Sequence, residues 1–112
     1  MLPEFLNSYQ TLTAGNTGLV VQDDKTILCG WSISNSGAAV QHVKLYNKAT
    51  APTASDTPAL RITIPAGQTV SGSFPGGIVF SAGLSVRSVT TMPDNGATGT
   101  TSGEVAVNLF FQ

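Results

Sequence analysis

Short runs in which apolar and polar residues alternate, separated by Gly, Pro, Asn and Asp, make up most of this sequence of 112 residues. An alternation with a period of two places one face of a β-strand against a core and the other in water. No long segment has the roughly 3.6-residue period of an amphipathic helix. The pattern therefore predicts an all-β chain with about seven or eight short strands.

The run from Thr26 to Ser34 illustrates how the faces are assigned. Its odd positions include Ile27, Cys29 and Trp31, so these side chains are expected to face the core. Leu28 is then an apolar exception on the outer face.

Turn-forming residues between the runs predict how the strands connect. Residues 23–25 and 65–67 are suited to hairpins. Residues 49–58 carry two prolines and little apolar content, which indicates a crossover between two sheets. Residues 91–103 are rich in Gly, Thr, Ser and Ala, which predicts an exposed, mobile loop.

These elements predict a single domain, an antiparallel β-sandwich or jelly roll over residues 17–112. The last run, residues 104–112, has apolar residues on both faces, because Phe110 points opposite to Leu109 and Phe111. We expect this strand to be covered on both sides.

Residues 1–16 precede the sandwich pattern as an N-terminal arm. Leu2, Phe5, Leu6 and Tyr9 give the arm a large apolar surface. The arm either docks on a neighbouring molecule or adds an edge strand or a helical turn to its own core, and the sequence leaves both interpretations open. In the first case these four residues bind a partner, and removal of residues 1–13 leaves a folded domain.

Charge is scarce in this chain. Charged residues make up 10% of the sequence and the formal net charge is −1, so no basic face exists to bind nucleic acid or an anionic membrane. Ala, Gly, Ser and Thr supply 48 of the 112 positions. A surface of small, neutral residues suits a subunit that is buried against copies of itself or against a shell.

Groups that catalyse reactions are also scarce. His42, the only histidine, lies on the polar face of a predicted strand beside Lys44, where a solvent-facing or interface histidine fits better than a catalytic base. Cys29, the only cysteine, is expected to pack as a small hydrophobe. The acidic residues are scattered over turns and strand ends. We expect no enzymatic activity, no cofactor and no metal site.

Tyr46 shares the polar face with His42 and is the best candidate for an exposed aromatic side chain. We assign it as a partner-binding residue. A sugar-binding platform would need two or three aromatics in one plane, and the sequence does not place such a set around Tyr46.

A series of motifs carries a resemblance to known proteins. They are Gly30-Trp31, Val43-Lys44-Leu45-Tyr46-Asn47-Lys48, Ile64-Pro65-Ala66-Gly67, Phe74-Pro75-Gly76-Gly77-Ile78-Val79-Phe80 and Val107-Asn108-Leu109-Phe110. In these motifs the chain resembles small β-sandwich virion structural proteins of tailed bacteriophages, a group that includes capsid decoration or cement proteins. The resemblance begins at Leu19 and excludes the arm.

The resemblance implies a decoration protein on the capsid exterior of a virion, assembled in the host cytoplasm. Its partners would be the major capsid protein and copies of itself, as a homotrimer, and it would stabilise the shell by bridging neighbouring capsid proteins. The shared motifs are turns and core positions, so they bring no catalytic residues. Two other functions stay open, namely a tail, neck, baseplate or fibre-associated subunit of the virion and a glycan-binding β-sandwich module.

Overall fold

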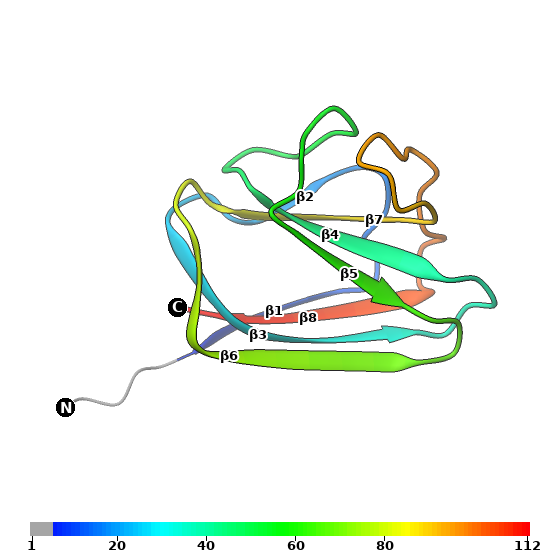
Figure 1. The fold of residues 1–112 in the computed structure, drawn as a ribbon, viewed down its shortest axis with the longest axis horizontal. Helices are drawn as coiled ribbons and strands as arrows, with labels where there is room; N and C mark the ends of the chain where they lie inside the picture. The colour runs from blue at the N-terminus through cyan, green and yellow to red at the C-terminus, as the bar shows by residue number, and fades with distance from the viewer. Residues whose placement is uncertain (1–5) are drawn as a thin grey trace.

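The computed structural model describes residues 6–112, which form eight antiparallel strands in two sheets (Figure 1). The strands are β1 (Asn7–Thr11), β2 (Leu19–Gln22), β3 (Thr26–Asn35), β4 (Gln41–Asn47), β5 (Leu60–Ile64), β6 (Thr69–Phe80), β7 (Leu84–Val89) and β8 (Val105–Phe111). The first sheet has the order β1-β8-β3-β6 and the second sheet the order β2-β7-β4-β5. This strand order is that of a jelly roll, which confirms the predicted fold class.

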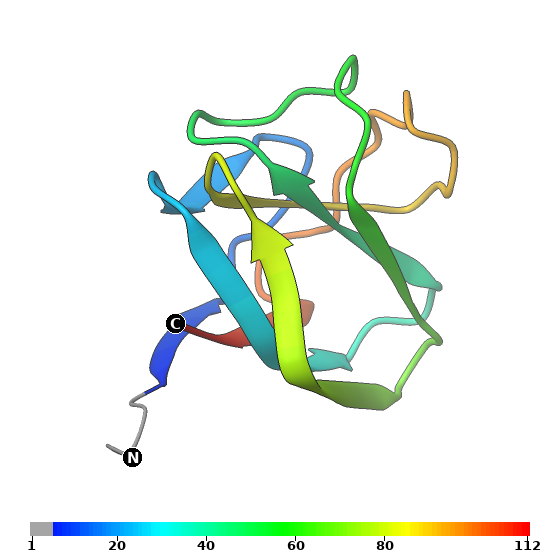
Figure 2. The ribbon, with the colours of Figure 1, turned by 60° about the vertical axis from the view of Figure 1, so that its left-hand side comes forward.

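Consecutive strands cross from one sheet to the other in every case except β4 and β5 (Figure 2). The two predicted hairpins are therefore wrong, because residues 23–25 and 65–67 each connect strands of different sheets. The predicted crossover at residues 49–58 is also wrong, since it joins β4 and β5, which pair within the second sheet. Turn chemistry specifies that the chain reverses, but it does not specify which strand becomes the neighbour.

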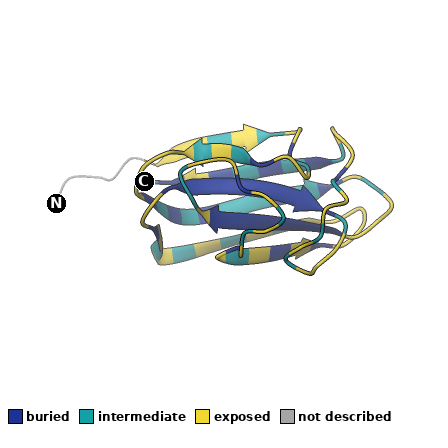
Figure 3. Cartoon of the chain, turned by 90° about the horizontal axis from the view of Figure 1, so that it is seen from above, coloured by how far each residue is buried: buried dark blue, intermediate teal, exposed yellow. Residues whose placement is uncertain are grey.

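The core lies between the two sheets. Each sheet contributes alternate apolar side chains, among them Val43 and Leu45 from β4 and Val107 and Leu109 from β8, all fully buried. Burial of one such side chain stabilises the fold by about 1.5–3 kcal/mol. In Figure 3, β4 and β7 are dark blue along nearly their whole length, which means that their outward side chains are covered as well.

A β-bulge in β3 corrects the predicted faces of this strand. The pairing of β3 with both of its neighbours shifts between Leu28 and Gly30. Leu28 pairs with the inward Phe111 and is fully buried, whereas Ile27 pairs with the exposed Val79. The extra residue thus reverses the alternation, so that Leu28 faces the core and Ile27 does not.

A close backbone approach positions Trp31 on the inner face of the first sheet. Gly72 pairs with Trp31, and a Cβ atom at Gly72 would lie 2.5 Å from Trp31 Cζ2. The Trp31 and Phe74 rings pack with their centroids 5.1 Å apart, and Trp31 packs partly buried against the core as expected.

The described part of the N-terminal arm belongs to the sandwich. Asn7–Thr11 pairs with β8 as an edge strand, Tyr9 packs against the core, and Ala14 is buried within it. The Gly103 amide donates a hydrogen bond to the Leu12 carbonyl (2.7 Å), which connects the end of β1 to the loop between β7 and β8. Of the two interpretations of the arm, the structure shows the edge strand.

Candidate interaction surfaces

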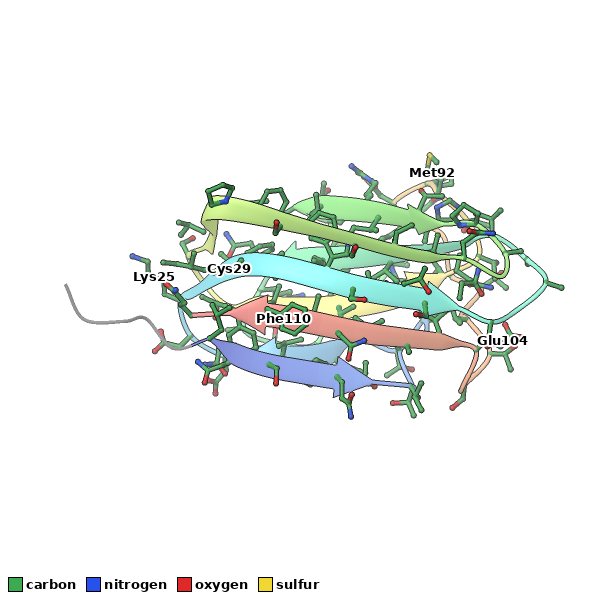
Figure 4. All side chains as sticks on the ribbon, turned by 90° about the horizontal axis from the view of Figure 1, so that it is seen from below. Lys25, Cys29, Met92, Glu104 and Phe110 are labelled. Carbon is green, nitrogen blue, oxygen red and sulfur yellow. The ribbon has the colours of Figure 1, made fainter. Side chains whose placement is uncertain are left out.

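The outer face of the first sheet carries small, neutral side chains in three cross-strand rows. We call these residues the uncharged face, because none of the described residues on it is charged. The rows are Ser8, Phe110, Gly30 and Ser73; Gln10, Asn108, Ser32 and Ser71; and Ala106, Ser34 and Thr69. Figure 4 shows Phe110 within this sheet, whereas Lys25 and Glu104 lie at its ends.

The uncharged face is open, with few fixed contacts. The Ser34 and Thr69 hydroxyls share a hydrogen bond of 2.9 Å, and the Asn108 side-chain amide donates to the Ser32 carbonyl at 3.1 Å. Phe110 keeps 36% of its surface exposed, so the predicted cover on both sides of β8 is wrong. A shallow hollow of about 290 Å³ lies beside Gln10, Leu12 and Asn108.

The outer face of the second sheet is different, because two loops lie over it (Figure 1). They are the β4–β5 connection, residues 48–59, and the loop after β7. The loop after β7 spans residues 90–103, and residues 91–103 were expected to be exposed and mobile. Most of its residues are exposed, but Thr100 is buried and its amide donates to the Ser88 carbonyl at 3.1 Å. The Thr100 hydroxyl also donates to the Gln41 side chain at 2.7 Å. The loop is therefore attached to the sheet, and the expectation of a simply exposed loop is corrected.

Arg87 is fully buried beneath this loop and holds several neutral groups together. Its Nε donates to the Asn16 carbonyl at 2.9 Å, and its Nη1 donates to the Tyr46 hydroxyl at 3.0 Å. Its Nη2 donates to the Asn16 side-chain oxygen and to the Gly96 carbonyl. One guanidinium thus connects the segment before β2, strand β4 and the loop after β7.

Lys44 lies opposite Arg87 in the pairing of β4 with β7 and is also fully buried. Its Nζ donates to the Pro93 carbonyl at 2.5 Å. Burial lowers the Lys44 pKa, and the charges of Arg87 and Arg61 lower it further against the opposing effect of Asp94. Asp94 itself forms an ion pair with Arg61 on β5.

Three of the five partner-binding residues predicted from sequence are described, and these three differ in exposure. Leu2 and Phe5 lie outside the described residues. Leu6 is 55% exposed, whereas Tyr9 is half-buried against the domain's own core. Tyr46 is only 1% exposed, so its prediction as an exposed aromatic is wrong: the polar face of β4 is covered by loops that are distant in sequence.

His42 is also buried: a solvent-facing or interface position was expected, and the residue is 8% exposed. Its Nδ1 shares a hydrogen bond of 3.0 Å with the Thr63 hydroxyl. Burial lowers the His42 pKa from its ordinary value of 6.5, and the neighbouring Lys44 charge lowers it further. The folded chain therefore favours a neutral imidazole.

Acidification is expected to destabilise the domain through His42. Below pH 6.5 the unfolded chain binds a proton at this residue, while the lowered pKa delays binding in the folded chain. Stability must therefore fall as the pH drops from the unfolded pKa toward the folded one. Urea denaturation at about pH 7 and about pH 5 should show a smaller loss for His42→Gln than for the unchanged chain. Equal losses in both proteins would contradict this cause.

Within residues 6–112, no group of three or more His, Cys, Asp or Glu side chains is placed to hold a metal ion. The same residues include no helix that is long and apolar enough to cross a membrane.

Comparison with known proteins adds no assignment. No protein-family model matches this chain, and no curated protein matches it.

Proposed function

We propose that this chain is a virion structural protein, a capsid decoration protein that binds the outer shell and bridges major capsid proteins. The observation that carries the proposal is the uncharged face, which presents three rows of neutral, mostly small side chains among the described residues. Eight-stranded jelly rolls are common in viral capsid proteins and in lectins, which is support by analogy of fold alone.

The composition of this face suits burial against another protein. Interface cores are depleted in Lys, Glu and Asp, because removing a charge from water is costly. Short side chains such as Ser32, Ser71 and Ser34 lose little conformational entropy when a partner covers them, and Phe110 supplies an aromatic anchor of the kind that is enriched in interfaces.

Such a protein would act by binding energy alone. A ligand that binds the assembled shell and not its separated subunits stabilises the shell by mass action. Particles that lack the protein should therefore lose integrity at a lower temperature than complete particles.

The copy number in purified virions tests the location. Quantitative mass spectrometry against the major capsid protein should give a ratio of the order of one per capsid protein, or one trimer per capsomer. A few copies per particle would favour the tail, neck or baseplate instead, and absence from virions would overturn the proposal. The glycan-binding alternative needed an exposed Tyr46 as its aromatic contact, and Tyr46 is buried.

Introducing a charge in the middle row of the uncharged face should abolish most shell binding. Ser71 lies in the middle row and is exposed, so Ser71→Glu should fold normally and bind particles lacking the protein at least about tenfold more weakly, because the unpaired charge would be desolvated. Ser102→Glu, which adds the same charge at an exposed position of the loop before β8, is the matched control. Co-sedimentation with the particles measures both variants, and equal binding would place the contact elsewhere.

A further inference from the structure

We propose that the free edge of β1 pairs with the β1 edge of a second copy, antiparallel and about a twofold axis at Tyr9. This contact would join the first sheets of two copies into one sheet of eight strands. The inference concerns the purified protein and does not rest on the proposed function.

The argument begins with the edges of the second sheet. An exposed strand edge presents unpaired backbone groups, and proteins protect such edges with bulges, charges, prolines or covering loops. β2 has four residues and an irregular register, and the residue before it, Gly18, lies against Pro52 of the β4–β5 connection. β5 has the charged Arg61 within it and is flanked by Pro58 and Pro65. Both of these edges are protected.

The two edges of the first sheet differ from each other. β6 contains Pro75, which has no backbone N–H, and its register with β3 is interrupted. β1 pairs with β8 in a continuous register over five residues, Asn7 to Thr11. None of these described residues is charged or a proline, so β1 is the edge with the fewest barriers to a new partner.

The residues around β1 complement each other under twofold symmetry. In an antiparallel pair centred on Tyr9, position 8 of one copy lies opposite position 10 of the other, and position 6 lies opposite position 12. Leu6 and Leu12 are 55% and 57% exposed. Both lie one residue beyond the ends of β1. Leu12 lines the hollow beside Gln10 and Asn108, on the outer side of the sheet, and extension of the strand by one residue at its start would place Leu6 on the same side as Ser8. The pairing therefore places each exposed leucine opposite an exposed leucine of the second copy, on both sides of the axis.

The size of the contact predicts its strength and stoichiometry. A pairing of seven residues is about 23 Å long and buries less than the roughly 1,200 Å² of a standard stable complex. The dimer should therefore dissociate on dilution. Because an isologous contact closes at two copies, the free protein should be a dimer and not the trimer that the resemblance implies.

Two double variants test the register. Leu6→Lys with Leu12→Lys places like charges opposite each other at both leucine pairs, whereas Leu6→Glu with Leu12→Lys places opposite charges there. Positions 6 and 12 of one chain are about 20 Å apart, beyond the screening length of about 8–10 Å, so the two variants differ mainly across the dimer contact. Sedimentation over a wide concentration range should show that the first variant dimerises at least about tenfold more weakly than the second.

The control is Val79→Lys, which changes a 56% exposed valine on the opposite edge strand, β6. Its dimerisation should equal that of the unchanged chain, and thermal unfolding should show that every variant is folded. Equal dimerisation by the two double variants would overturn the proposed register. An unchanged chain that stays monomeric at every concentration, or a trimer that no β1 substitution weakens, would overturn the contact itself.

Discussion

Removal of residues 1–11 is expected to destabilise the domain by about 3 kcal/mol, a large share of the roughly 5–15 kcal/mol that keeps a domain folded. The truncation deletes the backbone pairing of β1 with β8 and uncovers the edge of β8, where Tyr9 and Thr11 lie beside Leu109 and Val107. It also removes Tyr9, which packs against the core. Each lost hydrogen bond contributes about 0.5–1.5 kcal/mol, and the apolar burial adds to it.

Urea denaturation of the truncated and intact chains measures this effect. Two substitutions within β1 separate its causes. Tyr9→Ala should lower the unfolding free energy by about 1–2 kcal/mol, since the ring is half-buried. Ser8→Ala, on the exposed side of the same strand, should change it by less than about 0.5 kcal/mol. If the truncated chain unfolded at the same urea concentration as the intact chain, β1 would make no contribution to the stability of the domain.

Replacement of the two buried cations is expected to have different effects on the unfolding free energy. Arg87→Met should destabilise the domain by about 3 kcal/mol, because it leaves the Asn16 and Gly96 carbonyls and the Tyr46 hydroxyl without their charged donor. Lys44→Met should be neutral or stabilising within about 1 kcal/mol, since Lys44 makes one hydrogen bond and lies beside another cation. Methionine fits both sites because it is long and unbranched.

Chemical denaturation at neutral pH compares the two variants directly. Hydrogen exchange adds a local readout, because Arg87 holds the loop of residues 90–103 through the Gly96 carbonyl. The Thr90 and Thr100 amides, which donate to Thr98 and Ser88 carbonyls, should exchange faster in Arg87→Met than in Lys44→Met, which removes only the hydrogen bond to the Pro93 carbonyl of this loop. A Lys44→Met variant that is as unstable as Arg87→Met would show that the lysine charge is needed.

The alternation of apolar and polar residues was sufficient to predict the strands. It failed where contacts between segments distant in sequence determine the pairing or the burial. Val43 and Leu45 face the core as their alternation indicates. The bulge at β3 was not predictable, because its only trace is the apolar Leu28 at an apparently outward position. The choice between hairpins and crossings also depends on pairing between distant segments, which no turn residue encodes.

The candidate surfaces were also predictable only in part. The serines at positions 32, 34, 71 and 73 are recognisable as outward residues from sequence, but their assembly into one face requires the β3–β6 pairing. Tyr46 and His42 occupy the polar positions of an alternating strand, so they were expected to face solvent. Tyr46 is hydrogen-bonded to the buried Arg87, which also binds the loop after β7, and His42 is hydrogen-bonded to Thr63 on β5. Sequence alternation contains no information about such contacts between distant segments.

The place of β8 in the first sheet has a consequence for biosynthesis. β8 lies between β1 and β3, both of which precede it by most of the chain. While the ribosome is still translating the earlier segments, β1 has no neighbour in its sheet and β3 has only β6. Pairings between such distant segments form slowly and leave strand edges open in the meantime. Folding of this domain should therefore be completed only after translation of β8, and nascent chains shortened before β8 should be the form that chaperones retain.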